Sequence, residues 1–456
     1  MAKKDIRAVF NGLKKDELIE ILMQICEKDK IIKEKLLFEY AESSSVGKKK
    51  LESVIDKVIK KYAGRHEFIE YREVGYFAND MFEILDKVTQ NTNIKDNLTN
   101  TLIFMTKAIE SFQFADDSNG DIGDLVYSCL ENLQNQAVTV SEENDKSRNE
   151  IFSELLKYTE NEVLDFSGEY IVSIINIALI LVDNDILRKK LENKVEFLLE
   201  KANDEEYGGY EIEAYKHILL DMKRKFASEK EIQKFINDNI NISSFRKLVI
   251  DEYLKVKDYE MALKIIIEGE EVDKQYRGIV SDWKNLRYNI YKEMGAKDEQ
   301  YKLAMELYKD RNFAYYNELK LMSTGKEKEL YEKLKEYEKT KNKDYFYKDS
   351  MYINLILIED DMEALLEVVV KDPSSITYYA DKLFRIYKKE VADIYEFFIK
   401  EEADRASDRK RYKALCKYIK EFLKYADLER KTKLVDELLE KYKKKPAFVD
   451  ELNKIL

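Results

Sequence analysis

Apolar residues recur along this chain at the spacing of one face of an α-helix. Positions i, i+3, i+4, i+7 and i+8 are filled repeatedly, which predicts amphipathic helices that each bury one face. No sustained alternation of polar and apolar residues bounded by Gly or Pro, the pattern of half-buried strands, is found. The sequence therefore predicts an all-α protein. Such stripes occur in each third of the chain: Leu18, Ile21, Leu22, Ile25 and Cys26; Tyr259, Ala262, Leu263, Ile266 and Ile267; Met362, Leu365, Leu366, Val369 and Val370.

The composition agrees with this fold class. The 456 residues contain only 2 Pro and 13 Gly, too few turn formers for a β-sandwich, barrel or propeller, while 45% hydrophobic residues are enough for a core. The length suits several domains or one continuous repeat array.

Three segments resemble one another and read as second helices of antiparallel pairs entered through an acidic turn: KDYEMALKII from Lys257, KDEQYKLAMELY from Lys297 and DDMEALLEVV from Asp360. Their spacing is unequal, unlike the roughly 34-residue period of tetratricopeptide units. Because one helix pair cannot bury its apolar face alone, the pairs must stack. We therefore expect an irregular α-solenoid, a tetratricopeptide-like superhelix.

Polar stretches at residues 43–50, 139–148 and 203–209 are the candidate joints, and the last holds the Gly-Gly pair of the chain. We place an N-terminal helical region at residues 1–205. A tetratricopeptide-like repeat region follows at residues 206–456.

The sequence offers no motif for catalysis or metal binding. Cys26, Cys129 and Cys416 are far apart and odd in number, which favours a reducing compartment and free thiols. With His66 and His217 as the only histidines, no CxxC, HExxH or HxxxH spacing exists for zinc. Neither histidine accompanies a nucleophile motif, and no GxxxxGK[ST] or GxGxxG is present. We expect a non-enzymatic protein with no cofactor.

The most apolar run, residues 170–182, is interrupted by Ser173 and Asn176 and is shorter than the ~20 residues that cross a bilayer. It reads as a buried helix. The first residues lack the apolar core and cleavage site of an export signal. We expect a cytoplasmic protein without a membrane partner.

Three segments resemble a bacterial helical-repeat family often found beside SWIM-type zinc fingers: LKKDELIEILMQICEKDKIIKEKLL; FQFADDSNGDIGDLV; and LFRIYKKEVADIYEFFIKEEADRASDRKRYKALCKYIKEFL with LLEKYKKKPAFVDEL. The resemblance spans nearly the whole chain, but the finger itself, CxC…CxH, is absent. It implies tetratricopeptide-like helices and a binding role, with no catalytic residues to carry over.

The loop from Asp116 to Asp124 is acidic and contains Gly120. Oxygen-rich loops can hold calcium, but with Gly120 at the sixth position an EF-hand would begin at Ala115 and end at Val126, which lack the required carboxylates. We interpret the loop as a capped turn between helices, and cation binding stays open.

Aromatic residues are the candidate contact sites. The chain has 32 Tyr, and adjacent helical residues such as Tyr315 and Tyr316 point about 100° apart, so both can seldom be buried on one stripe. Trp283, Arg287 and Tyr291 share one helix face, where Arg287 can lie over Trp283. Such side chains suit a protein interface, and they suit equally the filling of wide gaps between helices.

The net charge of −12 disfavours a general nucleic-acid binder, but residues 405–456 carry 16 basic and 9 acidic residues. Arg409 and Arg411 belong to this basic region and could meet phosphates or an acidic protein surface.

We therefore predict a scaffold that binds another protein. A nucleic-acid-associated accessory protein that uses the basic C-terminal helices is the alternative, and self-association of acidic and basic regions is a third arrangement. The contact residues we propose from sequence are Trp283, Arg287, Tyr291, Tyr315, Tyr316, Arg409 and Arg411.

Overall fold

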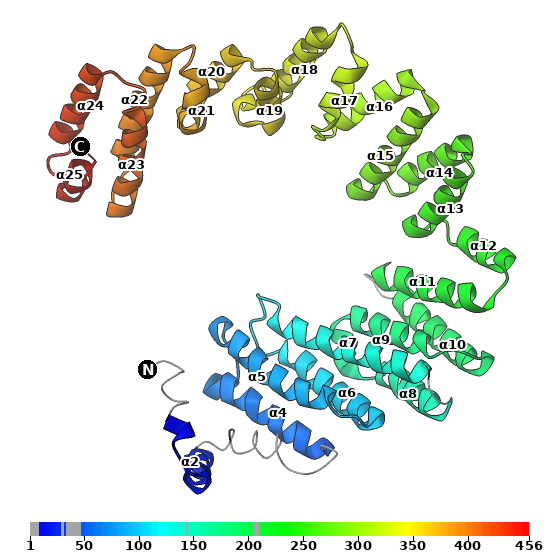
Figure 1. The fold of residues 1–456 in the computed structure, drawn as a ribbon. Helices are drawn as coiled ribbons and strands as arrows, with labels where there is room; N and C mark the ends of the chain where they lie inside the picture. The colour runs from blue at the N-terminus through cyan, green and yellow to red at the C-terminus, as the bar shows by residue number, and fades with distance from the viewer. Residues whose placement is uncertain (1–8, 29–31, 33–46, 143–144, 205–208, 456) are drawn as a thin grey trace. The chain divides into compact units, whose positions relative to one another are not determined.

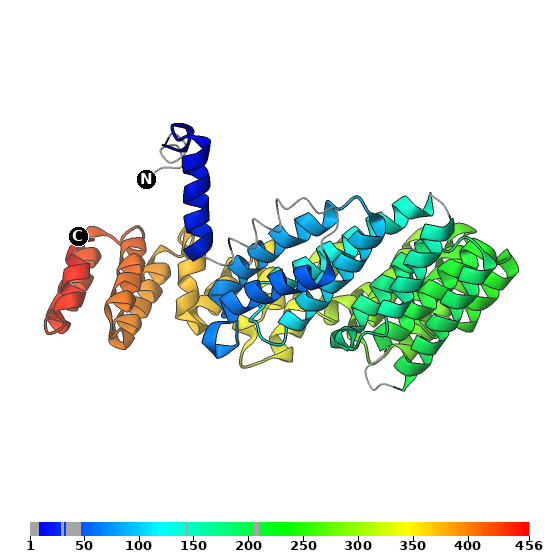
Figure 2. The same ribbon diagram turned by 90° about the horizontal axis from the view of Figure 1, so that it is seen from below.

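The computed structural model describes residues 9–28, 32, 47–142, 145–204 and 209–455. This part of the chain consists of α-helices, short 3-10 turns and connecting loops (Figures 1 and 2), and its only β-type pairing is an isolated bridge between Ile69 and Ala115. The all-α prediction is confirmed. The three predicted joints lie partly outside the described residues. The 3-10 turns are η1 (Gly64–His66), η2 (Glu162–Phe166), η3 (Phe346–Lys348) and η4 (Pro373–Ser375).

Two compact units make up the chain, Met1–Arg246 and Lys247–Leu456. Their division falls inside a helix rather than at the boundary near residue 205 proposed from sequence, and residues 205–208 are not among those described. The domain boundary from sequence stays a prediction. Across the described residues, no helix has both the length and the apolarity needed to cross a membrane.

The first unit stacks antiparallel helix pairs in two layers (Figure 1). Each helix of one layer pairs with the next helix in the other, so helices within a layer run parallel. Layer A comprises α4 (Lys48–Ala63), α6 (Ile94–Ser111), α8 (Asp145–Tyr158) and α10 (Asp185–Asn203). Layer B comprises α5 (Tyr71–Thr89), α7 (Asp121–Ser141), α9 (Gly168–Ile180) and α11 (Gly209–Phe226). The unit also contains α2 (Lys15–Lys28) and α12 (Glu229–Asp238).

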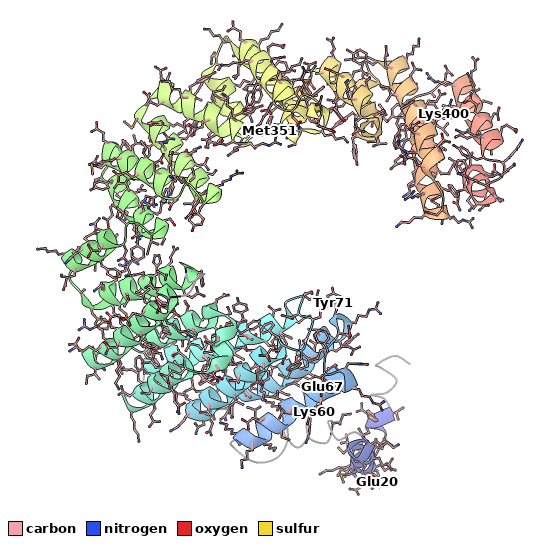
Figure 3. All side chains as sticks on the ribbon, turned by 180° about the vertical axis from the view of Figure 1, so that it is seen from behind. Glu20, Lys60, Glu67, Tyr71, Met351 and Lys400 are labelled. Carbon is pink, nitrogen blue, oxygen red and sulfur yellow. The ribbon has the colours of Figure 1, made fainter. Side chains whose placement is uncertain are left out.

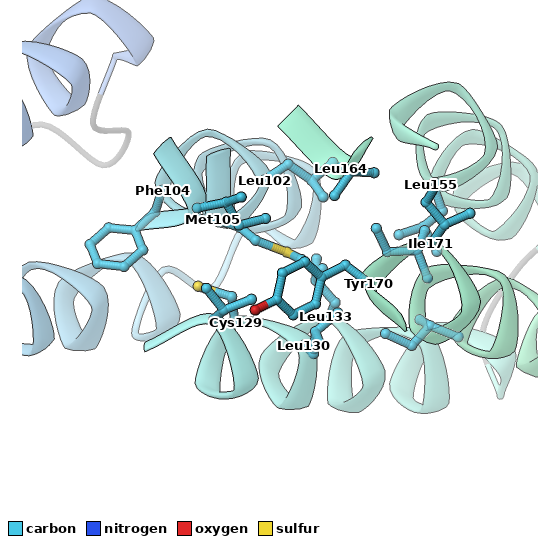
Figure 4. Close-up of a cluster of buried hydrophobic side chains, with 14 of the residues drawn as sticks. Leu102, Phe104, Met105, Cys129, Leu130, Leu133, Leu155, Leu164, Tyr170 and Ile171 are labelled. Atoms are coloured by element: carbon cyan, nitrogen blue, oxygen red, sulfur yellow. The ribbon is translucent and has the colours of Figure 1, made fainter. Parts of the chain in front are cut away.

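One continuous apolar core lies between the two layers and extends from α4 to α11. The run at residues 170–182, which the sequence identified as a buried helix, forms most of α9. Figure 4 shows the ring of Tyr170 among the core side chains, close to Cys129, Leu130 and Leu133 of α7. This burial raises the pKa of Tyr170 to about 12, so its phenol stays neutral.

Helix starts follow local capping chemistry. Ser228 and Glu231 form a capping box, and Pro446 occupies the first turn of its helix, where its missing N–H costs nothing. The carboxylate of Asp258 accepts the N–H of Met261 at 3.1 Å and so caps the helix that follows it. Asp298 lies within the first turn of a helix that begins at Lys297, and so does not cap that helix.

The second unit continues as consecutive helix pairs and contains two apolar clusters, one around α15 to α19 and one from η3 to the last helix. Its helices are α13 (Ser243–Lys255), α14 (Tyr259–Val272), α15 (Arg277–Met294), α16 (Lys297–Lys309), α17 (Tyr315–Met322), α18 (Glu327–Lys341), α19 (Ser350–Ile358), α20 (Met362–Lys371), α21 (Ile376–Leu383), α22 (Lys388–Arg405), α23 (Arg409–Phe422), α24 (Leu428–Lys441) and α25 (Pro446–Asn453). The division between the units falls within α13.

Polar side chains connect successive pairs of the second unit. Three times, a Tyr and a Lys four residues apart on one helix face share one carboxylate from the helix after next, and we call each such group a staple. Hydrogen bonds to a charged partner are about twice as strong as neutral ones. The staples are Tyr288, Lys292 and Glu318, from α15 to α17; Tyr316, Lys320 and Glu359, from α17 to the end of α19; and Tyr331, Lys335 and Asp361, from α18 to the start of α20.

The last two staples join the two apolar clusters. Tyr316 and Tyr331 belong to the first cluster, and their carboxylate partners lie in the turn between α19 and α20, two helices that both contribute to the second cluster. Although burial opposes it, the hydrogen bonds from Lys335 and Tyr331 hold the pKa of Asp361 below its usual value. The carboxylate therefore stays ionised.

Candidate protein-binding surface

The polar groups of Trp283 and Arg287, on the face proposed from sequence, are bonded to other residues of the same unit. Trp283 is only 5% exposed, and its Nε1–H donates to the carboxylate of Asp273 at 2.7 Å. Arg287 donates to Oε2 of Glu270 at 3.0 Å, across to α14. Tyr291 is partly buried against the first apolar cluster of the second unit. The expectation that Trp283 supplies exposed contact area is therefore corrected, since its ring lies in the interior.

Tyr315 and Tyr316 were expected to leave at least one ring exposed. Tyr316 is fully buried and belongs to a staple, while Tyr315 is partly buried and donates to Asn285 at 2.7 Å. The ring of Tyr315 also lies edge-on to Tyr288, with centroids 4.8 Å apart. The argument from the 100° angle assumes that a helix buries one face only. A short helix with neighbours on several sides can bury both members of an adjacent pair.

The basic C-terminal region is largely engaged with carboxylates of the same unit. Arg409 pairs with Asp450 and, at 2.8 Å, with Glu451, and Arg411 lies 3.7 Å from Asp408. Further pairs join α24 to α22, including Lys400 of α22 (Figure 3) with Glu437. These contacts reduce the positive charge that the region offers to phosphates.

Three exposed tyrosines lie near the N-terminal ends of helices of layer B. Tyr71 is the first residue of α5 (Figure 3), Tyr127 lies in the second turn of α7, and Tyr210 is the second residue of α11. Their side chains are 49%, 50% and 60% exposed. Because helices of one layer run parallel, these residues lie toward one end of that layer. We call Tyr71, Tyr127 and Tyr210 the tyrosine strip.

Hydrogen bonds fix two of these rings. The hydroxyl of Tyr71 donates to Oδ1 of Asn119, and that of Tyr127 donates to Oε1 of Glu169 on α9, both at 2.9 Å. The bond to Glu169 raises the pKa of Tyr127. A ring held in place loses little entropy when it meets a partner, which favours contact surfaces built on tyrosine.

The acidic loop before α7 is a capped turn, as we interpreted it. The carboxylate of Asp117 accepts the N–H groups of Ile122 and Gly123 at 2.8 and 3.2 Å, and Asp116 accepts that of Ser118. Throughout the described residues, no three His, Cys, Asp or Glu side chains are grouped to hold a metal ion. The loop thereby fixes the start of α7, the helix that carries Tyr127 of the tyrosine strip.

A groove of about 390 Å³ lies beside Tyr127, between α7 and α9. Residues at helical spacing on both helices line it, with Tyr127, Glu131 and Gln134 on one side and Ser173 and Asn176 on the other. The floor is apolar, formed by Leu130, Ile177 and Ile180. A groove with an apolar floor and polar walls can receive side chains and main chain of a bound segment.

His217, which accompanies no nucleophile motif in the sequence, contacts two residues at the start of α13. Its Nε2 lies 2.7 Å from Oγ of Ser244 at the start of α13, and its ring packs against Phe245 with centroids 4.6 Å apart. We assign no catalytic role to this pair.

Comparisons with known proteins identify no family. No protein family and no curated protein matches the chain. Among solved structures, it aligns with one described as a "Circular tandem repeat protein with novel repeat topology and enhanced subunit contact surfaces", at 13% identity and a TM-score of 0.19, over 93% of this chain and 97% of that one. The description of this chain as helical repeats rests on the helix packing given above.

Proposed function

We propose that the chain is a non-enzymatic helical-repeat module that binds another protein through the tyrosine strip and the adjoining groove. The observation that carries this proposal is the exposure of three tyrosine rings at one end of layer B, two of them fixed by hydrogen bonds. Tyrosine is enriched at protein interfaces because it combines a large apolar area with one polar group.

Two further points support the proposal. Stacked repeats commonly use extended surfaces for binding, and the resemblance to the bacterial helical-repeat family implies a binding role. All three cysteines are free thiols, which agrees with a cytoplasmic location.

The competing proposal is a nucleic-acid accessory protein that uses the C-terminal basic helices. The excess of basic over acidic residues in 405–456 favours this proposal. The ion pairs of Arg409 weaken it, because they reduce the positive charge available to phosphates. Binding through phosphates must weaken steeply as salt rises, so filter binding to DNA and RNA at two salt concentrations separates this proposal from the first.

Site-specific photo-crosslinking tests the protein-binding proposal. Benzoylphenylalanine replaces Tyr127 in the full chain, and a control chain carries it at Tyr378, which is 82% exposed on α21. After irradiation in the native cell and nuclease treatment, we expect a protein adduct from position 127 that position 378 does not give. Identical adducts from both positions, or none from position 127, would contradict the proposal.

A further inference from the structure

We infer that the segment bound at the tyrosine strip is cationic: an extended stretch rich in Lys and Arg that crosses α7, α9 and α11 near their N-terminal ends. This inference rests on the proposed function and names the chemistry of the partner. Charge, aromatic rings and unused amides on this surface each support it.

The carboxylates around Tyr127 and Tyr210 lack cationic partners. Asp121, Asp124, Glu131 and Glu211 form no ion pair with any residue that the structure describes, and Glu169 accepts only the hydroxyl of Tyr127. The staples of the second unit show the opposite behaviour, since each of their carboxylates has a lysine. An unpaired negative surface attracts a positive partner and repels phosphates.

The position of these carboxylates has a local cause as well. Asp121, Asp124, Glu169 and Glu211 lie in or beside first helical turns, where the positive end of the helix dipole stabilises them. Parallel helices therefore bring several such turns to one end of the layer, and the surface becomes acidic there. Lys201, which lines one pocket together with Glu211, already pairs with Asp165 at 3.3 Å, and Arg72 follows Tyr71 in the chain.

Exposed tyrosine rings beside carboxylates suit guanidinium and ammonium groups. A cation over the face of Tyr127 gains from the ring quadrupole and also lies near Glu169, to which that hydroxyl is bound. Tyr210 offers a second exposed ring next to Glu211. Arginine serves such sites well because its planar fork can stack on a ring and bind a carboxylate at once.

The groove supplies contacts for a main chain. Gln134 and Asn176 are exposed on its two walls, and neither side-chain amide has a hydrogen bond to a described residue. Each can donate to a carbonyl and accept from an N–H of an extended segment. Helices packed about 10 Å apart place α7 and α11 roughly 20 Å from each other, which about six extended residues would cross.

Fluorescence anisotropy of the full chain with labelled nonapeptides tests the inference. The probes alternate Gly with Arg, with Gln or with Glu. We expect the Arg peptide to bind with an affinity that falls as salt rises. The Gln and Glu peptides should not bind. Tyr127→Ala and Tyr210→Ala should each weaken binding of the Arg peptide about three-fold, and Glu131→Gln about two-fold. Tyr378→Ala is the matched control and should leave the affinity unchanged.

Equal binding of the Arg and Gln peptides, or Arg-peptide binding that the strip variants do not change, would overturn the inference. The substituted side chains are exposed, and circular dichroism of each variant checks that the helices remain. The crosslinking experiment distinguishes the two proposals: an adduct at position 127 whose attached segment lacks Lys and Arg would support protein binding and refute a cationic partner.

Discussion

Asp361 is the residue at which the staples can be tested most directly. Its Oδ1 accepts the N–H of Ala364 at 2.9 Å and caps α20, while its Oδ2 accepts from Lys335 at 2.5 Å and from Tyr331. Asp361→Asn keeps an oxygen for the cap but removes the charge and places an NH₂ group toward two donors. Asp361→Ala removes the cap as well.

The expected magnitudes follow from these contacts. The side chains of Asp361 and Lys335 are 16% and 24% exposed, so solvent screens the pair only partly. Losing a hydrogen bond to a charged group costs about 2–3 kcal/mol, and losing the cap adds about 1 kcal/mol. We therefore expect a destabilisation of about 2–3 kcal/mol for Asp361→Asn and about 3–4 kcal/mol for Asp361→Ala.

Hydrogen exchange of backbone amides in α18 and α20 measures this loss locally, which suits a repeat array that can open in parts. Exchange there should quicken about 30- to 150-fold in Asp361→Asn. The neighbouring Asp360→Asn is the control, because Asp360 is exposed with φ 50°, a conformation that Asn tolerates. Equal exchange rates in the two Asn variants would refute the stabilising role of the staple.

Three further predictions concern buried or paired groups. Hydrogen bonds from Tyr288 and Lys292 hold the pKa of Glu318 below its usual value, so its stabilisation is fully present at neutral pH and is lost as pH falls through the lowered pKa; Glu318→Gln should flatten the acid side of the melting-temperature profile. Glu338 is 1% exposed without a well-directed hydrogen bond to a described residue, and burial raises its pKa. Glu338→Met should therefore increase the free energy of unfolding by about 1–3 kcal/mol, seen as a higher urea midpoint, and a lower midpoint would contradict this. Ellman's reagent should label Cys26 well before Cys129, whose burial raises its pKa, and equal rates would refute this order.

The helices could be predicted because their signals are local. The segments from Lys257, Lys297 and Asp360 correspond to α14, α16 and α20, each the second helix of its pair. Their unequal spacing has a simple cause, since the pair α17 and α18 lies between the last two. Helix caps are less predictable, because several acidic residues near a helix start satisfy the same rule and only the backbone identifies the first turn, in which Asp298 lies.

The candidate surface could not be predicted, because its members come together only through layer packing. Tyr71, Tyr127 and Tyr210 lie in three separate helices, and no local pattern links them. The reverse holds for Tyr316, whose adjacency to Tyr315 suggested an exposed ring, although the ring is fully buried and its hydroxyl donates to Glu359. The staples did leave a sequence signal, a Tyr four residues before a Lys, which the periodicity of apolar residues does not consider.

The staples also limit how this array can gain or lose repeats during evolution or engineering. Each one joins a helix to the helix after next, so its two halves belong to different hairpins. Excising α17 and α18 would leave Tyr288 without Glu318 and would remove both tyrosine partners of the turn between α19 and α20. The hairpins of the second unit are consequently not interchangeable parts. A viable change in repeat number there must replace matched residues on both sides of the new junction.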